Sequence, residues 1–587
     1  MTTITPRSGN RKSNSGDAVA SFSPAQGAPG TLTAVPHADQ YRTTPPRPER
    51  VRPTPLGELA ARLGVETAGP AEAEVSGITH DSRAVRPGDL YAALPGARAH
   101  GADFVAQAAG LGAAAVLTDP SGRERAAATG LPVLVVEDPR GRMGDLAAEI
   151  YGRPGTDLLQ IGITGTSGKT TTAYLVEGGL RGAGRSTGLV GTVEMRIGDE
   201  RIKSERTTPE ATDLQALFAV MRERGVEAVA MEVSSHALVL GRVDGCVFDV
   251  AVFNNLSPEH MEFHSDMEDY FQAKARLFTP ERSRRAVVNL DDEYGRRLAK
   301  EATVPVVTFS AAGDPNADWR AEDVVTRAAD SVLTVIGPDG VRISATAPLP
   351  GPFNVANTLA AIVTLATAGI DPQTAADGIA AVPGVPGRLE RVDAGQPYLA
   401  VVDYAHKTDA VESVLRSLRE VTRGKLHVVI GCGGDRDTTK RGPMGAAAAR
   451  LADTAVLTSD NPRSEDPLAI LTAMLAGASE VPAYQRGEVL VDADRAAAIA
   501  TAVARAEPGD TVLVAGKGHE QGQEAAGVVR PFDDRQVLRE AILGRQRSEQ
   551  SRQDPQSPQS HQDQQDPQSQ QDQQSQQDEH RHQNSQG

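Results

Sequence analysis

Short hydrophobic segments alternate with longer alanine-rich segments through most of the chain. The short segments, such as "LLQIGITG" and "FDVAVFNNL", are rich in aliphatic residues and end at glycine or polar residues, which is typical of buried strands. The longer segments, such as "GPFNVANTLAAIVTLATAG", have the length and composition of helices. Because strands and helices are expected in alternation, the pattern predicts an α/β fold.

Three domains are expected between residues 55 and 544. At 587 residues, the chain is longer than a single hydrophobic core usually supports. The segment "VPGVPGRLE", which is rich in proline and glycine, predicts a linker. We expect a small first domain over residues 55–157, a central parallel-sheet domain over 158–384 and a Rossmann-like C-terminal domain over 385–544.

The two ends of the chain lack the hydrophobic periodicity of the middle. Residues 1–54 are rich in Pro, Ser, Thr, Gly and Arg, and the chain from Ser548 onward contains no Ala, Val, Leu, Ile, Met, Phe, Tyr or Trp. Such segments cannot bury enough apolar surface to offset the entropy lost on ordering. We therefore expect disordered tails over residues 1–54 and 545–587, and we interpret the C-terminal histidines as part of an inert, solvated segment.

Composition and charge narrow the class of protein. A net charge of −17 opposes general binding to nucleic acid, which requires a basic surface. No hydrophobic segment approaches the roughly 20 residues that span a bilayer, and the first residues form no apolar signal segment. The only two cysteines, Cys246 and Cys432, lie far apart in the sequence, which favours a reducing compartment. We expect a cytoplasmic protein that is a monomer.

The segment "GITGTSGKTTT" over residues 162–172 indicates a phosphate site of unusual form. The P-loop pattern G-x-x-x-x-G-K-[ST] places its first glycine where this chain has Ile163. The order of strand, glycine turn and helix nevertheless points backbone N–H groups and a helix dipole at an anion. Lys169 would neutralise phosphate charge, and the Thr170 hydroxyl would bind Mg²⁺. The residues predicted to bind the phosphates of a nucleotide are Gly165, Thr166, Ser167, Gly168, Lys169, Thr170 and Thr171.

A lysine lies on the apolar face of a predicted helix in "HSDMEDYFQAKARLF". Ser265 and Glu268 fit a capping box at the start of this helix, and Lys274 shares a face with Phe271 and Phe278. The spacing alone favours a lysine whose ammonium group reaches solvent. In the alternative, burial lowers the pKa of the amine, and the neutral amine captures CO₂ to become an anionic carbamate.

Four hydrophobic segments of the third predicted domain each end in a polar cluster. They are "YLAVVDYAH", "KLHVVIGCGGDRD", "TAVLTSDNPR" and "DTVLVAGKGHE". In open α/β sheets, ligands bind beyond the carboxyl ends of the strands. This repeated pattern therefore predicts a second binding site, separate in sequence from the phosphate loop.

The segment "TGTSGKTT" resembles the ATP loop of the Mur ligases, which form amide bonds at the expense of ATP; folylpolyglutamate synthases have a related loop. For the central domain, the resemblance implies a P-loop ATPase type of fold. It implies Mg²⁺ as cofactor, with Thr170, Glu232, His260 and a carbamylated Lys274 (N6-carboxylysine) as ligands and Lys169, Lys274, His260 and Glu232 as catalytic residues. The family usually has Asp before the histidine, where this chain has Glu259. A zinc peptidase is rejected, because HExxH requires Glu directly after the first His.

The resemblance extends to the binding of a UDP-linked substrate. The segment "THDSRAVRPGDLYAALPGARAHGADF" is similar to the UDP-binding part of the Mur ligase that adds the third peptide residue. The implied contacts to UDP-N-acetylmuramoyl-L-Ala-D-Glu are Ser82, Ala97, Arg98, Ala99, Thr207, Thr208, Ser234 and Arg242. Asn357 and Arg388 match contacts to ATP.

In the third domain, the resemblance selects the amino acid. Arg463 of "SDNPR" offers a planar, two-pronged donor that suits a carboxylate, and diaminopimelate has a second carboxylate that lysine lacks. The implied diaminopimelate contacts are Arg436, Asp460, Asn461, Pro462, Arg463, Gly516 and Glu520. The "DYAH" segment also matches, although Lys407 and Thr408 stand where Thr-Pro is common.

Together these features predict an ATP-dependent amide ligase of peptidoglycan precursor synthesis. The resemblance implies that the γ-phosphate of ATP passes to the side-chain carboxylate of D-Glu, and that the amine of 2,6-diaminopimelate, with the meso isomer favoured, attacks the acyl phosphate. A folylpolyglutamate synthase would share the ATP loop, but it would not require the arginine of "DNPR". A Mur ligase that adds the terminal dipeptide and a non-catalytic nucleotide-binding regulator remain further alternatives.

Overall fold

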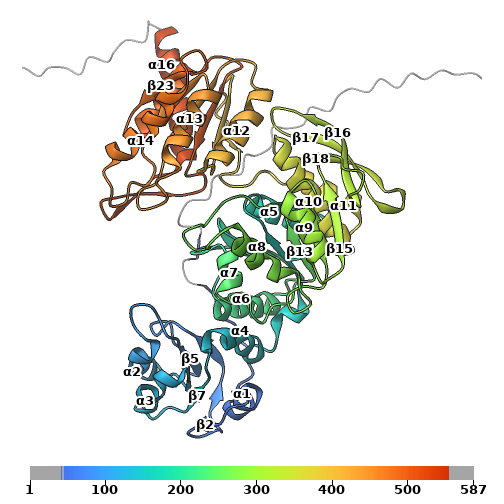
Figure 1. Cartoon of the computed structure of the whole chain (residues 1–587), viewed down its shortest axis with the longest axis vertical. Coiled ribbons are helices and arrows are strands. Elements are labelled where there is room, and N and C mark those ends of the chain that lie inside the picture. Colours follow the sequence, from blue (N-terminus) through green and yellow to red (C-terminus); the bar gives the residue numbers. More distant parts are fainter. Residues whose placement is uncertain (1–40, 43–44, 554–587) are drawn as a thin grey trace, which may run out of the picture. The chain divides into compact units, whose positions relative to one another are not determined.

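The computed structural model describes residues 41–42 and 45–553 (Figure 1). Most of the two predicted tails lies outside the described residues. Strands and helices alternate along the described chain and form three separate multi-stranded sheets with helices packed on them. The α/β prediction with three domains is therefore confirmed. The sheets occupy residues 67–135, 159–347 and 390–515, whereas the domain boundaries themselves stay predictions.

The first sheet has five strands in the order β2-β7-β6-β5-β4. The strands from β7 to β4 run parallel, and β2 is antiparallel to β7. These strands are β2 (Thr67–Ala68), β4 (Gly77–Thr79), β5 (Asp89–Ala93), β6 (Ala115–Thr118) and β7 (Val133–Val135). The short pair β1 (Thr54–Pro55) and β3 (Glu74–Val75) accompanies them, with helices α1 (Leu56–Leu63), α2 (Val105–Gly110), α3 (Arg123–Ala127) and α4 (Pro139–Ile150).

The central sheet has eleven strands in the order β11-β10-β9-β12-β8-β13-β14-β15-β16-β17-β18. The prediction of a parallel sheet holds from β9 to β16, but antiparallel strands extend both ends. The strands are β8 (Leu159–Thr164), β9 (Thr187–Val190), β10 (Glu194–Ile197), β11 (Glu200–Lys203), β12 (Ala228–Glu232), β13 (Val250–Phe253), β14 (Ala286–Asn289), β15 (Val306–Ser310), β16 (Trp319–Thr326), β17 (Ser331–Ile336) and β18 (Arg342–Ala347).

Helices cover both faces of the central sheet, and each face has its own hydrophobic core. The helices are α5 (Lys169–Gly182), α6 (Ala211–Glu223), α7 (Ser235–Val239), α8 (Met267–Ala275), α9 (Glu293–Glu301), α10 (Pro352–Thr367) and α11 (Pro372–Ala380). Helices α5, α10 and α11 pack together in one core, whereas α6, α8 and α9 contribute to the other. Strand β8, which leads into the phosphate loop, lies between β12 and β13 in the middle of the sheet.

The third sheet has six strands in the order β19-β20-β24-β21-β22-β23. Its strands are β19 (Glu390–Arg391), β20 (Leu399–Asp403), β21 (Leu426–Ile430), β22 (Thr454–Leu457), β23 (Glu488–Val491) and β24 (Thr511–Ala515). All except β19 run parallel, so the four predicted polar clusters do lie at one edge of the sheet. The parallel strands and the helices on both faces agree with the Rossmann-like prediction, although the strand order differs from the 3-2-1-4-5-6 order of dinucleotide-binding folds.

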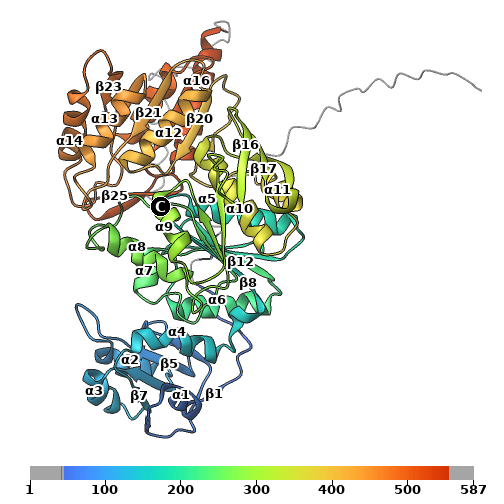
Figure 2. The ribbon, with the colours of Figure 1, turned by 45° about the vertical axis from the view of Figure 1, so that its right-hand side comes forward.

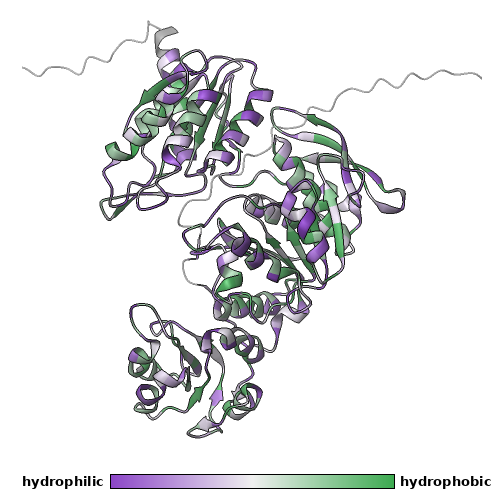
Figure 3. Cartoon of the chain, viewed as in Figure 1, coloured by the Kyte–Doolittle hydropathy of each residue, from purple (hydrophilic) through white to green (hydrophobic). Residues whose placement is uncertain are grey.

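Helices pack on both faces of this sheet (Figure 2). They are α12 (Thr408–Val421), α13 (Arg441–Leu451), α14 (Pro467–Glu480), α15 (Arg495–Arg505) and α16 (Asp534–Gln553), and a hairpin of β25 (Gly522–Ala525) and β26 (Val528–Pro531) precedes α16. In α12 the residues Val411, Val414, Leu415 and Leu418 are buried at helical spacing, which turns the polar face outward. Figure 3 shows this contrast between the hydrophobic strands and the largely hydrophilic α12.

The structure corrects the inner limits of both predicted tails. Before residue 55, Arg47 forms an ion pair with the buried Asp89 at 2.6 Å, and the backbone N–H of Arg50 donates to Glu223 at 2.7 Å. After residue 544, α16 continues to Gln553, and Arg545 donates to the carbonyl oxygen of Val503 at 2.6 Å. The hydrophobic pattern did not predict that these two segments pack on the domains, because charged side chains rather than apolar ones hold them.

No helix in the described part of the chain combines the length and the hydrophobicity that a bilayer crossing requires. Both cysteines are buried and free.

Candidate active site

The turn between β8 and α5 explains the displaced glycine of the phosphate loop. Ile163 is fully buried within β8, so the position of the usual first glycine belongs to the strand. The turn itself depends on Gly165 at φ 151° and Gly168 at φ 83°. A Cβ atom on Gly168 would also lie 2.4 Å from Oδ1 of Asn357. Conformation and space therefore both require glycine at Gly168.

Helix α5 presents its N-terminus directly after this turn. Gly168 is the N-cap residue and has no side chain with which to cap the first N–H groups of the helix. Asn255 holds the turn in place, because its Oδ1 accepts from the backbone N–H of Ser167 at 2.9 Å. A helix N-terminus with uncapped N–H groups is a favourable site for a phosphate.

Lys169, Thr170 and Glu232 form the chemical centre of the loop. The Nζ atom of Lys169 donates to the carbonyl oxygens of Gly165 and Thr166 at 2.7 and 2.8 Å, and burial lowers its pKa. The Thr170 hydroxyl donates to Oε1 of the buried Glu232 at 3.0 Å. Hydroxyl and carboxylate oxygens are ligands that Mg²⁺ prefers, so this pair fits a magnesium ion.

Arg388 extends the site from the other side. Its Nη2 donates to the Thr170 hydroxyl at 3.3 Å, and its guanidinium carbon lies 4.5 Å from the centre of the Tyr404 ring. Stacking on an aromatic ring and a hydrogen bond to Thr170 fix the cation beside the loop. Arg388 lies within the proline- and glycine-rich segment that opens the predicted third domain, so the C-terminal part of the chain contributes a charge to the phosphate loop.

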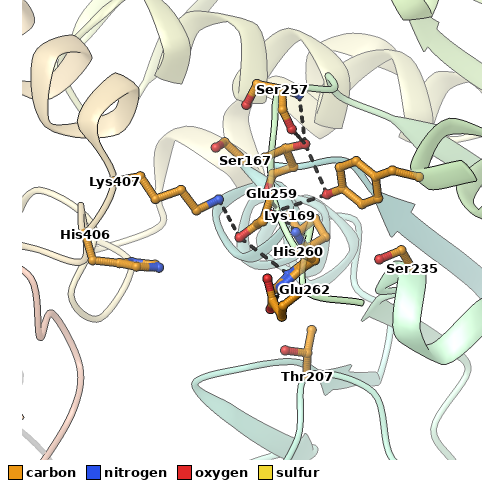
Figure 4. Close-up of polar contacts among 12 residues, drawn as sticks. Ser167, Lys169, Thr207, Ser235, Ser257, Glu259, His260, Glu262, His406 and Lys407 are labelled. Carbon is orange, nitrogen blue, oxygen red and sulfur yellow. Dashed lines mark hydrogen bonds and ion pairs between the residues drawn. The ribbon is translucent and has the colours of Figure 1, made fainter. Parts of the chain in front are cut away.

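One cavity of about 540 Å³ collects many of the predicted residues. Those that line it are Thr166, Ser167, Gly168, Lys169, Thr170, Thr171, Thr207, Glu232, Ser234, His260, Asn357 and Arg388. Its wall also contains Asp403, Tyr404, His406 and Lys407 from the end of β20 and the start of α12. Figure 4 shows the side chains of Lys169, Glu259, His260 and Lys407, which all line this cavity. The cavity thus brings together the predicted ATP residues except Gly165 and the predicted metal ligands except Lys274, although their roles stay predictions.

The predicted metal set is only partly assembled. Among the residues that the structure describes, no three His, Cys, Asp or Glu side chains are grouped so that they could hold a metal ion. His260 has φ 59° and lies beside Glu259 and Glu262, at 3.5 and 3.4 Å. Burial lowers its pKa, which keeps the imidazole available as a neutral ligand. Thr170 and Glu232 therefore fit Mg²⁺ directly, whereas the roles of His260 and Lys274 as metal ligands remain proposals.

Lys274 does not reach solvent. It is 1% exposed, and its Nζ donates to the carbonyl oxygen of Gly165 at 3.0 Å. Burial, reinforced by repulsion from Lys169, holds the pKa of this lysine well below its usual value. The preceding helix start differs from the prediction, because Asp266 rather than Ser265 is the N-cap of α8. The spacing argument for a solvent-reaching lysine is wrong, since Lys274 is held behind the phosphate loop.

We expect a carbamate on Lys274 when the protein is kept in bicarbonate. The buried, neutral amine is the form that reacts with CO₂. A ¹³C NMR spectrum recorded with ¹³C-bicarbonate should show a carbamate resonance that the Lys274→Met variant lacks. A Lys300→Met variant, which changes an exposed lysine of α9, serves as the control and should retain the resonance. An identical spectrum for the wild type and Lys274→Met would contradict the assignment.

Only some of the residues predicted to contact the UDP-linked substrate line the cavity. Thr207 and Ser234 line the cavity, whereas Thr208 is buried behind it and donates to the carbonyl oxygen of Glu232 at 2.8 Å. Arg242 is held by Glu210, whose Oε1 accepts from its Nε at 3.0 Å. Ser82, Ala97, Arg98 and Ala99 belong to the first sheet's loops and do not line this cavity; residues 97–99 are exposed.

A second polar centre lies at the carboxyl edge of the third sheet. The Nζ atom of the fully buried Lys517 donates to Asn461 and Glu520, both at 3.0 Å, and lies 3.7 Å from Asp460. Asn461 in turn donates to Glu520 at 2.9 Å. Gly516 is required beside them, because a Cβ atom there would lie 2.8 Å from Asp460. Four predicted diaminopimelate contacts therefore meet around one buried lysine.

The Arg463 loop adjoins this centre and has a strained backbone. Arg463 has φ 54°, and its Nη1 donates to the carbonyl oxygen of Gly434 at 2.6 Å. Its backbone N–H donates to the carbonyl oxygen of Glu524 in β25 at 3.0 Å. Because a positive φ is costly for arginine, the loop is held by these neighbours rather than by local preference. Pro462 precedes Arg463 in this loop, and the nearby Arg436 is exposed.

Sequence reasoning missed three residues that support the phosphate loop. Thr192 donates to Glu232 through its N–H at 2.8 Å, Asn255 binds Ser167, and Asn254 donates to Thr172 at 3.0 Å. Asn254 and Asn255 follow β13, the strand beside β8. Ligands bind beyond the carboxyl ends of parallel strands, and this rule identified the polar clusters of the third domain. Applied to β13, it would also have identified Asn254 and Asn255.

Three family profiles match the chain. Residues 163–365 match the Mur ligase middle domain, residues 387–518 the Mur ligase glutamate ligase domain, and residues 74–151 the Mur ligase family catalytic domain. The UDP-N-acetylmuramoyl-L-alanyl-D-glutamate–2,6-diaminopimelate ligase of Streptomyces coelicolor is 82% identical over 498 residues, which cover 85% of this chain and 98% of that protein. The ligase of the same name from Corynebacterium efficiens is 47% identical over 514 residues, which cover 86% of this chain and 97% of that protein.

Solved structures of Mur ligases are also similar to this chain. A UDP-N-acetylmuramoyl-L-alanyl-D-glutamate–2,6-diaminopimelate ligase is similar with a TM-score of 0.62 at 31% identity, over 84% of this chain and 100% of that one. MurF from Acinetobacter baumannii has a TM-score of 0.58 at 18% identity, over 84% of this chain and 99% of that one. At that identity, the second likeness concerns the fold alone.

Proposed function

The chain belongs to the Mur ligase family, and we propose that it adds 2,6-diaminopimelate to UDP-N-acetylmuramoyl-L-Ala-D-Glu and converts ATP to ADP and inorganic phosphate. The match to this chain covers 98% and 97% of the length of two relatives whose names give this activity. The structural observation that carries the proposal is the cavity in which the phosphate loop, the Thr170–Glu232 pair and Arg388 meet.

The first half of the reaction transfers the γ-phosphate of ATP to the side-chain carboxylate of D-Glu. We assign the phosphate chain to the N-terminus of α5, where Lys169 neutralises negative charge and the turn at Gly168 lets the backbone approach closely. Arg388 adds a second positive charge beside Thr170. Mg²⁺, held by Thr170 and Glu232 with His260 and the Lys274 carbamate as further ligands, would offset the charge of the phosphates.

The second half of the reaction joins the amine to the acyl phosphate. The amine of diaminopimelate attacks the acyl carbon, the C–O bond to the phosphate breaks, and inorganic phosphate leaves. We assign the amino acid to the carboxyl edge of the third sheet, where Arg463 would bind the distal carboxylate and Asn461 and Glu520 would hold polar groups of the substrate. Exclusion of water from the cavity protects the acyl phosphate from hydrolysis.

The UDP end of the substrate is assigned to the first sheet. Ser82 and the exposed loop of residues 97–99 would contact the nucleotide, and Thr207 and Ser234 would direct the peptide end toward the cavity. Because ATP and UDP-linked precursors are cytoplasmic metabolites, we also propose a cytoplasmic enzyme. We propose that it acts as a monomer, because one chain contains all the assigned residues.

The decisive experiment measures phosphate release with ATP, Mg²⁺ and UDP-N-acetylmuramoyl-L-Ala-D-Glu. Meso-diaminopimelate, LL-diaminopimelate and L-lysine are supplied separately. We expect turnover with a diaminopimelate isomer, the meso form in particular, and far slower turnover with lysine. Turnover with lysine alone would retain the ligase chemistry but overturn the amino-acid assignment, and turnover only with a folate and glutamate would favour a folylpolyglutamate synthase.

A further inference from the structure

Two charged residues from distant parts of the sequence contact each other. Glu259 directly precedes His260, and Lys407 directly follows the "DYAH" segment. The Nζ atom of Lys407 forms an ion pair with the Glu259 carboxylate, and both side chains are largely buried, at 20% and 14% exposure (Figure 4). Glu259 follows β13 and Lys407 is the N-cap residue of α12, so distant segments of the sequence supply the two charges.

The carboxylate of Glu259 is surrounded by cationic and polar side chains. Besides its ion pair with Lys407, it lies 3.5 Å from Nε2 of His260 and interacts electrostatically with Lys169. The Tyr270 hydroxyl also donates to Oε2 of Glu259 at 3.4 Å. One carboxylate therefore balances two lysines, one from the phosphate loop and one from the start of α12.

Other contacts fix the start of α12 beside the phosphate loop. The Ser257 hydroxyl donates to Oδ2 of Asp409 at 3.2 Å, and the Thr166 hydroxyl donates to the carbonyl oxygen of Ser257 at 3.1 Å. Lys407 lines the same cavity as Lys169 and Thr170. A lysine in this position needs no large movement of the backbone to meet a phosphate bound at α5.

We propose that Lys407 is a second lysine for the triphosphate and that Glu259 holds it at the cavity until the nucleotide binds. This inference rests on the proposed function, which makes ATP the ligand. The triphosphate brings more negative charge than one carboxylate, so the ammonium group of Lys407 moves from Glu259 to an oxygen of the γ-phosphate. The γ-phosphate is its target because the segment that carries Lys407 belongs to the domain assigned to the attacking amine.

A cation at the γ-phosphate assists the transfer step as well as binding. Negative charge is spread over the equatorial oxygens of the transferring phosphoryl group, and a preorganised ammonium group stabilises that charge without reorganisation of water. Lys169, from the loop, and Lys407, from α12, would then approach the phosphate chain from different segments. Lys407 is thus a binding residue for ATP, and Glu259 is a positioning residue that acts through it.

The test compares nucleotide affinities of the whole chain by calorimetry. The variants are Lys407→Met, Lys407→Arg and Glu259→Gln, with Lys300→Met on the exposed face of α9 as the matched control. We expect Lys407→Met to weaken binding of a non-hydrolysable ATP analogue by about 10-fold and to leave ADP within about 2-fold. Lys407→Arg restores most of the loss. Glu259→Gln tightens the analogue by about 3-fold, because it removes the competing carboxylate.

Every outcome of this test decides the inference. Unchanged affinity of Lys407→Met for the ATP analogue overturns it. Equal losses for ADP and the analogue, or a loss that accompanies a lower melting temperature, also overturn it, because they indicate a purely structural ion pair. Binding of nucleotides is measured without diaminopimelate, so failure of the amino-acid assignment is detected separately by the phosphate-release assay. A wild-type chain that binds neither nucleotide would instead refute the proposed function.

Discussion

Replacement of Lys169 by Ala is expected to lower kcat for phosphate release by about 10³-fold, because it removes the charge closest to the β- and γ-phosphates. Lys169 is the first residue of α5, and its Nζ lies within the loop, 2.7 Å from the carbonyl oxygen of Gly165. Loss of the side chain removes its two hydrogen bonds to loop carbonyl oxygens, but the conformations of Gly165 and Gly168 and the bond from Ser167 to Asn255 still support the turn. The effect should therefore fall on catalysis rather than on folding.

The measurement is steady-state phosphate release with all three substrates, accompanied by the melting temperature of each variant. Lys300→Ala, which changes an exposed residue of α9, is the control and should behave as the wild type. A melting temperature within a few degrees of the wild type separates a catalytic defect from unfolding. Activity of Lys169→Ala within about 3-fold of the wild type would show that the loop does not carry the phosphoryl transfer.

Much of this site could be predicted from local sequence, because short segments determine its key geometry. The strand, the glycine turn and the first residues of α5 are contiguous, so the pattern over residues 162–172 contained the phosphate loop. The same holds for Asp460, Asn461 and Glu520, which follow strand ends in a parallel sheet. Their convergence follows from the topology of any such sheet.

The features that the sequence did not reveal arise from contacts between distant segments. Lys407 and Glu259 are 148 positions apart, and no local rule pairs them. The burial of Lys274 likewise depends on the loop that packs over α8. Helical spacing could predict only that Lys274 lies on the apolar face of its helix. Segments before β1 and at the end of α16 escaped prediction because ion pairs and hydrogen bonds hold them where no apolar periodicity exists.

Removal of the Arg463 guanidinium should affect the amino acid alone. We expect Arg463→Ala to lower kcat/KM for diaminopimelate by about 10³-fold, since a buried carboxylate would lose its charge-assisted hydrogen bonds. Arg463→Lys retains the charge but loses the planar, two-pronged geometry, and we expect a loss of about 30-fold. The affinity for ATP should be unchanged in both variants, because Arg463 lies in the C-terminal sheet's loop and does not line the cavity of the phosphate loop.

The ratio of kcat/KM for diaminopimelate to that for L-lysine is the quantity that decides this prediction. If Arg463 binds the distal carboxylate, it contributes binding energy for diaminopimelate but none for lysine. The ratio should then fall in proportion to the loss of kcat/KM for diaminopimelate. Arg416→Ala, at an exposed arginine of α12 that is 61% accessible, is the matched control and should leave the ratio unchanged. A loss of equal size for both amino acids would mean that Arg463 only supports its loop through Gly434 and β25. In that case the second carboxylate would have to be recognised by another cation at this edge, and the exposed Arg436 would become the next residue to replace.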